Sequence, residues 1–375
     1  MRSKIKVKVK GFETSEEVKK MTCYHPLLRY ETWEKYKCAD GHEAYKAKVF
    51  NPAPYYKNEY ETVEAYAQSL LEHNHYRRVQ IIPCGKCIGC RLEYSKQWAT
   101  KGIYEAEEHK DNWFLTLTYD EEHLPIGSST IDPKTGEENG PLLSGTLKAV
   151  DFTNFIKRLR EYYDRKYNHK GIRFMGCGEY GATSNRAHYH CIMFNLPILE
   201  SMMQFHEYND NYEPMWRVPE LEKIWGRGLV VAAEVNWNTC AYVARYITKK
   251  VGIPTEKDYY KCLGIEPEFF RMSRKPGIGR SYYEKHKDEI YKIDKMLITK
   301  YNGGKMEVKP PKYYDKLYDI ENPEKMKEIK ENRKKDQKRR NKIKYSKTTH
   351  YKKEQLKIEE NIKKDKTSTL KREKI

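Results

Sequence analysis

Two histidines separated by one residue, His188 and His190, lie in the segment AHYHCIMFN at 187–195, which is predicted to form a β-strand. Because side chains alternate along a strand, both imidazoles face one side of the sheet and Tyr189 faces the other. Two such imidazoles can bind one divalent ion, and Glu179 on the preceding predicted strand adds a hard oxygen ligand. The remaining coordination positions would be open to phosphate oxygens, as a Lewis-acidic metal on a phosphodiester requires.

A tyrosine pair lies on the next predicted helix, WNTCAYVARYITKKV at 237–251. Tyr242 and Tyr246 are four residues apart and therefore share a helix face, which also carries Lys249. A phenol there can attack a phosphodiester and form a covalent phosphotyrosine, and a nearby lysine can stabilise phosphate charge. The opposite face is apolar and is expected to pack on the sheet; it carries Cys240, Ala244, Ile247 and Val251.

Both motifs also have other interpretations. Two ordinary histidines can lie in a half-exposed strand, and two histidines with a carboxylate also bind the iron of some oxygenases. The ligand order differs from those oxygenases, however, and the basic charge of the chain has no place in that interpretation. The tyrosine spacing alone is weak, because 32 tyrosines produce chance pairs such as Tyr56/Tyr60. The combination of the two motifs is what favours a nucleophile beside a metal.

A cysteine cluster, Cys84, Cys87 and Cys90, places three thiols within seven residues. A structural zinc ion takes four ligands, and Cys23 is the candidate for the fourth. Structural Zn²⁺ is favoured over an iron–sulfur cluster, because the remaining cysteine and proline pattern of a ferredoxin is missing. The spacing leaves three rivals for the fourth position, which are Cys38, His25 and His42.

The bulk composition points to a polyanionic partner. The chain has 375 residues, a formal net charge of +18, a pI near 9.2 and a mean hydropathy of −0.96. Such an excess of positive charge favours nucleic acid or an anionic membrane surface. No apolar run reaches the ~18 residues of a membrane span, and the N-terminus shows no apolar core of a secretory signal. We therefore expect no membrane partner and a place in the cytoplasm of the cell that makes the protein.

The elements that must position these residues predict an α+β fold. Their order, roughly β-α-β-β-α-β-α after a first helix, fits an antiparallel sheet with helices on one face, as in ferredoxin-like or RRM-like folds. The predicted helices cover 92–109, 151–167, 219–225 and 237–251, and the predicted strands 114–119, 172–181, 187–195 and 229–236.

Four parts follow along the chain. Residues 1–95 are expected to be an irregular, metal-stapled segment, 96–255 the core, 256–314 an extension and 315–375 a basic low-complexity tail. Over 331–375, 18 Lys/Arg stand against 7 Asp/Glu, so a net +11 lies there. The tail is expected to be disordered or loosely helical, either as a solvated end or as a non-specific DNA tether.

Together these residues resemble the replication initiators of small isometric single-stranded DNA phages, the microviruses, and most closely their gokushovirus-like branch. The resemblance covers roughly residues 20–255, in the order of the family. It rests on MTCYHP (21–26), CGKCIGCRLEYSKQWATK (84–101), FLTLTYD (114–120), GEYG (178–181), RAHYHCIMF (186–194) and YVARYITKK (242–250).

The resemblance implies a HUH-type rolling-circle replication endonuclease. It implies that Tyr242 and Tyr246 are alternating nucleophiles assisted by Lys249, with Mg²⁺ or Mn²⁺ at His188 and His190. A tyrosine would nick single-stranded DNA at the replication origin and remain linked to the 5′-phosphate, and the second would later resolve the circle. Such an initiator acts with a host helicase and polymerase in the cytoplasm of the bacterial host.

The same resemblance suits Cys23 as partner of the later cysteines, since the family opens with a cysteine ahead of the triad. The sequence before Cys23 is longer than we expect for the family. DNA is expected to lie on the sheet face that bears Thr116 and Thr118, with Arg186 as a phosphate contact.

Two rival functions share these features. A relaxase or transposase of the same chemistry usually carries further domains, for which 375 residues leave no room. A non-catalytic, zinc-containing single-stranded DNA binding protein explains the charge, cysteines and aromatics but leaves the two motifs as coincidence. A divalent-metal requirement for strand cleavage separates these rivals from the nuclease.

Overall fold

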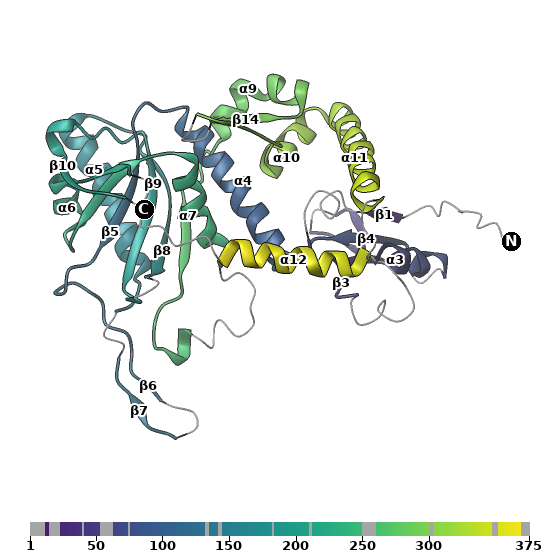
Figure 1. Cartoon of the computed structure of the whole chain (residues 1–375), viewed down its shortest axis with the longest axis horizontal. Coiled ribbons are helices and arrows are strands. Elements are labelled where there is room, and N and C mark those ends of the chain that lie inside the picture. The colour runs from purple at the N-terminus through teal and green to yellow at the C-terminus, as the bar shows by residue number, and fades with distance from the viewer. Residues whose placement is uncertain are drawn as a thin grey trace. The chain divides into compact units, whose positions relative to one another are not determined.

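The computed structural model divides the chain into two compact units (Figure 1). Unit 1 joins Met1–Glu93 with Glu321–Leu370, and unit 2 is essentially Tyr94–Ile320, together with Lys371–Ile375. Within the described part of the chain, no helix is both long and apolar enough to cross a lipid bilayer. The structure describes residues 12–14, 23–39, 41–52, 63–73, 76–131, 135–141, 145–181, 184–209, 212–249, 260–299, 303–346 and 352–368.

Unit 2 is built on a seven-stranded sheet whose neighbouring strands all pair antiparallel. The central strands are β5, β9 and β8, which the alternating segments of the sequence predicted. In spatial order the strands are β10 (Gln204–Tyr208), β11 (Pro214–Arg217), β12 (Val230–Glu234), β5 (Asn112–Thr118), β9 (Ala187–Phe194), β8 (Arg173–Tyr180) and β13 (Phe269–Met272).

Helices cover both faces of this sheet (Figure 1). On one face α5 (Ala149–Tyr167) and α6 (Pro219–Trp225) pack on alternate strand residues such as Leu115 and Tyr189. On the other face lie α4 (Ile88–Ala106) and α7 (Trp237–Lys249), against residues such as Phe114. The expectation of helices on one face is therefore wrong. Periodicity identifies the apolar side of each helix, but it does not say which face of the sheet the helix covers.

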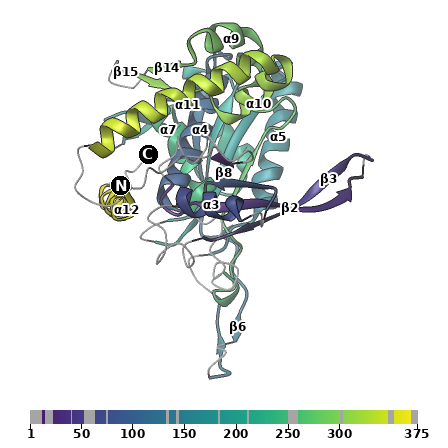
Figure 2. The ribbon, with the colours of Figure 1, turned by 90° about the vertical axis from the view of Figure 1, so that its right-hand side faces the viewer.

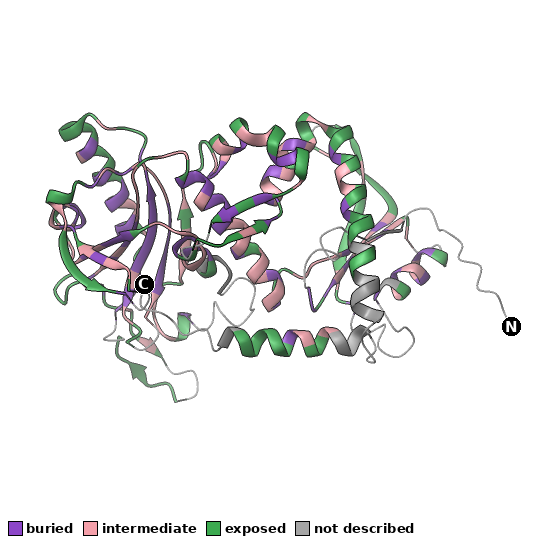
Figure 3. Cartoon of the chain, turned by 45° about the horizontal axis from the view of Figure 1, so that its top comes forward, coloured by how far each residue is buried: buried purple, intermediate pink, exposed green. Residues whose placement is uncertain are grey.

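Burial confirms the central strands as the core of unit 2 (Figure 3). Phe114 and Leu115 on β5 point to opposite helical layers and are both buried. Cys177, Cys191 and Cys240 are buried members of these cores. Unit 2 also contains η1 (Glu200–Met202), the hairpin β6 (Thr130–Ile131) and β7 (Glu138–Asn139), α9 (Arg280–Ile293), the hairpin β14 (Met296–Thr299) and β15 (Lys305–Val308), and most of α10 (Lys312–Glu321).

The N-terminal part of unit 1 is a folded layer of sheet and helix. The prediction of an irregular segment over 1–95 is wrong here, because Leu28, Val79 and Ile81 alternate inward and form a core with α3. The strands escaped notice because charged and aromatic residues fill their outer positions. The sheet order is β1 (Phe12–Thr14), β4 (Arg78–Ile82), β2 (Leu27–Lys37) and β3 (Glu43–Phe50), with α3 (Val63–Glu72) packed on it.

The C-terminal region is helical where the structure describes it. The expectation of a disordered tail is wrong for α11 (Pro323–Ser346) and α12 (Lys352–Ser368). Lys, Glu and Arg are good helix formers, so a charged composition does not oppose these helices. A few inward residues add packing, because Met326 is 1% exposed and Leu356 packs against the cysteine cluster.

Candidate metal and nucleophile site

The strand register brings three of the predicted ligands to one place. In the β8–β9 pair Glu179 lies opposite His188, and in the β5–β9 pair Thr116 lies opposite His190. Because alternate residues share a face, Glu179, His188 and His190 all point to the side of the sheet that α4 and α7 cover. Tyr189 points to the other side, as predicted, and is fully buried against α5 and α6.

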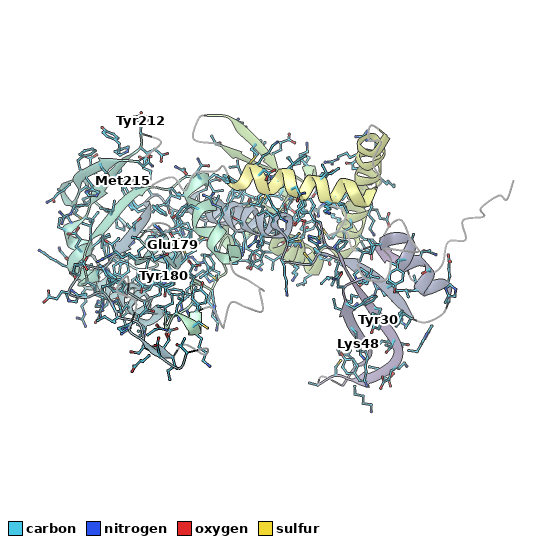
Figure 4. The ribbon with its side chains drawn as sticks, turned by 60° about the horizontal axis from the view of Figure 1, so that its bottom comes forward. Tyr30, Lys48, Glu179, Tyr180, Tyr212 and Met215 are labelled. Carbon is cyan, nitrogen blue, oxygen red and sulfur yellow. The ribbon has the colours of Figure 1, made fainter. Side chains whose placement is uncertain are left out.

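Glu179 is the centre of this cluster (Figure 4). Its Oε1 atom lies 2.9 Å from His188 Nε2 and 3.0 Å from His190 Nε2. The ligand atoms of all three residues lie within 4.8 Å of one another. Two atoms that each lie about 2.1 Å from an octahedral ion are about 3 Å apart, so this donor set fits one divalent ion. Two imidazoles and one carboxylate leave further coordination positions for a substrate.

Each histidine is oriented by its other ring nitrogen. His188 Nδ1 lies 2.9 Å from the backbone carbonyl of Arg186, and a proton on Nδ1 donates to that oxygen. His190 Nδ1 lies 3.0 Å from the Thr116 hydroxyl. These contacts fix the rings with Nε2 toward Glu179, which is the arrangement that strengthens histidine as a metal ligand.

Burial and hydrogen bonding act in opposite directions on Glu179. Its side chain is almost fully buried, and burial alone would raise the pKa of the carboxyl. Hydrogen bonds from His188 and His190 prevail and lower the pKa of Glu179 to about 2. The group is therefore an anion at neutral pH, as a metal ligand must be.

Tyr242 on α7 reaches the same cluster. Its hydroxyl donates to Glu179 Oε1 at 2.9 Å and lies 3.5 Å from His190 Nε2. The Tyr242 ring stands edge-on to the His190 ring at 5.1 Å. Cys240 and Ala244 are fully buried, as the opposite helix face predicted. A phenol oxygen is thus within hydrogen-bonding distance of a predicted metal ligand.

The other residues of the predicted nucleophile face lie outside what the structure describes. The backbone of α7 runs to Lys249. The side chains of Tyr246, Ile247 and Lys249, and the whole of Val251, lie outside the described residues. Their predicted roles therefore stay predictions.

The predicted DNA contacts take different positions. Thr116 contacts His190, so its observed role is to orient a ligand. The Thr118 hydroxyl faces the Leu229 carbonyl at 3.5 Å. The Arg186 guanidinium donates to Glu121 at 2.7 Å and to the Tyr119 carbonyl at 2.8 Å. Its side chain is 29% exposed, so it lies at the rim of this strand end.

A buried network that the sequence did not reveal lies behind the histidine strand. The hydroxyls of Tyr119 and Tyr189 are 2.7 Å apart, and Tyr119 also donates to Asp151 at 2.9 Å. Tyr189 donates to the Lys148 carbonyl at 3.0 Å. Burial raises the pKa of Tyr189 to about 12, so it stays a neutral donor. These contacts tie the strand between the two histidines to the start of α5; the only sequence signal was an acidic residue at a helix start beside two inward tyrosines.

The four predicted cysteines also meet, within unit 1. The sulfur atoms of Cys23, Cys84, Cys87 and Cys90 lie within 4.8 Å of one another, and those of Cys84 and Cys90 are 3.9 Å apart. Ligands 2.3 Å from a tetrahedral zinc ion are separated by about 3.8 Å. The backbone N–H groups of Lys86 and Cys87 donate to Cys84 Sγ at 3.4 and 3.3 Å. The rival ligand His25 instead pairs with Glu360 at 2.7 Å.

Comparison with known proteins identifies the family. The family model for the replication-associated protein ORF2 matches residues 112–251. The replication-associated protein ORF2 of Spiroplasma virus 4 is 37% identical over 241 residues, which are 64% of this chain and 68% of the relative. The chain belongs to the phage replication-associated proteins. VP4 of Bdellovibrio phage phiMH2K is 30% identical over 65% of this phage replication protein and 69% of its own length. ORF4 of Chlamydia phage 1 is 28% identical over 60% and 51%.

The resemblance to microvirus replication proteins is thereby confirmed. No solved structure matches this phage replication protein. The matched segment 112–251 contains Glu179, His188, His190 and Tyr242. The residues that meet in the structure therefore all belong to the part that defines the family.

Proposed function

We propose that this phage replication protein initiates rolling-circle replication by nicking single-stranded DNA at the origin with a tyrosine nucleophile. The observation that carries the proposal is the position of the Tyr242 hydroxyl, 2.9 Å from Glu179 Oε1. That carboxylate also faces both histidines. A nucleophile and three candidate metal ligands thus converge on one point.

Glu179, His188 and His190 would hold Mg²⁺ or Mn²⁺, which would polarise the scissile phosphate when bound. The Tyr242 oxygen would form a bond to phosphorus, and the bond from phosphorus to the 3′-oxygen would break. The tyrosine proton leaves Oη, where Glu179 accepts its hydrogen bond, and the departing 3′-oxygen takes up a proton. The products are a 5′-phosphotyrosine and a free 3′-hydroxyl that can prime a host polymerase acting with a host helicase.

The second tyrosine completes the cycle in this proposal. Tyr246 lies one helical turn after Tyr242 on α7, so two nucleophiles follow one another along the same helix. After one round, Tyr246 would cut the regenerated origin, and the released 3′-hydroxyl would attack the first phosphotyrosine and close the circle. Holding both groups near one phosphate gives the proximity that such an exchange requires. Lys249 would stabilise phosphate charge, and the reactions would take place in the host cytoplasm.

The four cysteines would hold a structural Zn²⁺. Four thiols with the separation of tetrahedral ligands, and backbone N–H groups aimed at a sulfur, support this assignment. Hydrogen bonding to Cys23 lowers the pKa of the Cys87 thiol to about 6, which favours the thiolate that binds metal.

The deciding experiment traps the covalent intermediate. The full chain is incubated with single-stranded origin DNA and Mn²⁺, and adducts are separated on a denaturing protein gel. We expect an adduct that disappears with chelator, with His188→Ala and with the Tyr242→Phe/Tyr246→Phe double variant, because each removes the metal or the nucleophiles. Tyr60→Phe, one of the chance i,i+4 pairs, serves as the control. An adduct that persists in the double variant contradicts the assignment, and tight binding without any adduct favours the non-catalytic DNA-binding function.

A further inference from the structure

The sheet of unit 1 has one face on α3 and a second face with a different composition. Leu28, Val79 and Ile81 point toward α3. The alternate positions Arg29 and Glu31 on β2, and Arg78 on β4, point the other way. This second face is therefore built from charged residues in the part of the sheet where the structure describes side chains.

Three guanidinium groups on this face surround one carboxylate. Glu31 is 8% exposed and lies 3.0 Å from Arg29, 2.9 Å from Arg77 and 3.8 Å from Arg78. The three arginine side chains keep 35%, 38% and 35% of their surface exposed. Three cations held by one anion leave a local net charge of +2. The buried carboxylate fixes the guanidiniums, so little side-chain entropy is lost when they bind an anion.

Aromatic rings border the same cluster. The Arg77 guanidinium lies 3.8 Å from the centre of the Tyr45 ring on β3. Trp33 lies in the irregular part of β2, where the register to β3 shifts between Glu31 and Lys35, and 62% of its surface is exposed. Such bulges often redirect a side chain. Figure 2 shows this part of the β2–β3 hairpin extending past α3.

We infer that this face, consisting of Arg29, Trp33, Tyr45, Arg77 and Arg78 around Glu31, is a second binding site for single-stranded nucleic acid. The arginines would contact phosphates, and the exposed indole of Trp33 would stack on an unpaired base. Fixed cations beside an exposed aromatic ring are the combination that binds single strands without sequence readout. A duplex offers the same phosphates but keeps its bases stacked on each other, so the exposed ring favours single strands.

This inference goes beyond the nicking site. All six residues belong to unit 1, whereas Glu179, His188, His190 and Tyr242 belong to unit 2. The proposed function bears only on the type of strand, which would be the DNA displaced or templated during replication. The face would hold that DNA independently of cleavage.

Fluorescence anisotropy with a labelled 30-nucleotide oligothymidine, without added divalent cation, tests the site in the full chain. We expect Trp33→Ala to weaken binding roughly 5- to 100-fold, which is the usual effect of removing one stacking ring. Trp33→Phe should restore most of the affinity. The matched control is Phe205→Ala on edge strand β10 of unit 2, because Phe205 is similarly exposed, at 58%. Parental affinity in Trp33→Ala would overturn the inference.

Two further measurements separate its components. A blunt duplex of the same length should bind Trp33→Ala and the parent alike; an equal loss on duplex and single strand would overturn the stacking role. Arg77→Gln should flatten the dependence of log Kobs on log salt by roughly 0.7 for each phosphate that the side chain no longer neutralises, and an unchanged slope would overturn the phosphate role. If Arg77→Gln does not fold, the Trp33 pair still decides.

The outcomes also distinguish this site from the proposed function. Trp33-dependent binding without any covalent adduct would uphold the second site and reject the nicking chemistry. Adduct formation with Trp33-independent binding would do the reverse.

Discussion

At the scale of single residues, the site depends on how two histidine rings are held. His188 is fixed by a backbone carbonyl, but His190 is fixed by one side chain, Thr116, at 3.0 Å. A backbone contact cannot be removed by substitution, whereas the threonine can. Thr116 is therefore the residue through which ligand orientation can be tested without changing a ligand.

Thr116→Val should weaken Mn²⁺ binding roughly 10- to 100-fold, because a histidine that loses its outer hydrogen bond is a poorer and less fixed ligand. The concentration of Mn²⁺ that gives half-maximal adduct formation measures this effect. Thr116→Ser keeps the hydroxyl and should stay close to the parent. Parental Mn²⁺ dependence in Thr116→Val would show that Thr116 does not orient His190.

At the scale of elements, one buried carboxylate connects three segments of unit 2. Glu105, near the end of α4, is 1% exposed and accepts hydrogen bonds from Arg173 on β8 and from the Gly279 N–H at 2.6 Å. Burial would raise the pKa of Glu105, but contacts with His109, Gly279 and Arg173 hold it below its ordinary value. The carboxylate thus joins the helix, the sheet and the segment that leads into α9.

This contact should make stability depend on pH in a known direction. Because the folded-state pKa of Glu105 is lowered, its stabilisation is present above the ordinary glutamate pKa of about 4.3 and is lost as the pH falls through the lower folded-state value. Glu105→Gln should lower the free energy of unfolding by about 3 kcal/mol at pH 7. The difference should shrink below about pH 4.

Urea unfolding of both proteins across this pH range measures the difference. Glu161→Gln is the control, because that carboxyl pairs with Arg165 at an exposed position of α5 and contributes little. A difference between Glu105→Gln and the parent that stays constant from pH 7 down to pH values well below 4 would contradict the ionised-carboxylate explanation.

The elements also show what sequence can and cannot predict. The strands that carry His188, His190 and Glu179 were predicted because their apolar residues alternate clearly, and their short connection indicated antiparallel pairing. The same alternation placed Tyr189 away from the site. The strands β2 and β4 were not predicted, because Arg29, Glu31 and Arg78 fill their outer positions and weaken the pattern. The face of the sheet that each helix covers depends on tertiary packing, which periodicity does not encode.

The Thr116–His190 contact and the Tyr119–Asp151 network were also beyond sequence reasoning. Both join segments far apart in the chain, and each contact depends on register to within one residue. The four cysteines were within reach, because the chemistry of a four-ligand site leaves few choices once three thiols are adjacent. Cys23 was chosen among the rivals partly through the resemblance, and it does meet the cluster.

At the scale of the whole molecule, unit 1 is assembled from both ends of the chain. Leu356 on α12 packs against the cysteine cluster, and Glu360, 6% exposed, contacts His25 at 2.7 Å. Lys364 lies 3.4 Å from the other oxygen of Glu360. The expected basic tail therefore contacts the segment that the cysteines organise.

Removal of the proposed zinc should release α12, because Leu356 and Glu360 contact residues within or beside the metal cluster. Hydrogen exchange before and after treatment with a zinc chelator measures this: amides of Lys352–Ser368 should exchange faster, while β5, β9 and β8 keep their protection. Leu356→Ala, which leaves every cysteine in place, should loosen α12 with zinc still bound. Unchanged exchange in α12 after zinc loss would show that the helix docks independently of the cysteines.

The two-part origin of unit 1 also sets an order in time during protein synthesis. The ribosome completes Tyr94–Ile320 before it begins the 50 residues from Glu321 to Leu370 that complete unit 1. At about 5–20 residues per second, these residues take roughly 3–10 s. We expect the sheet with the tyrosine and histidines to fold on the nascent chain while its N-terminal neighbour still waits for α11 and α12. Ribosome-stalled chains that end shortly after Ile320, with linker enough to clear the exit tunnel, should already protect β5, β9 and β8 from protease; cleavage within those strands would show that both units mature together.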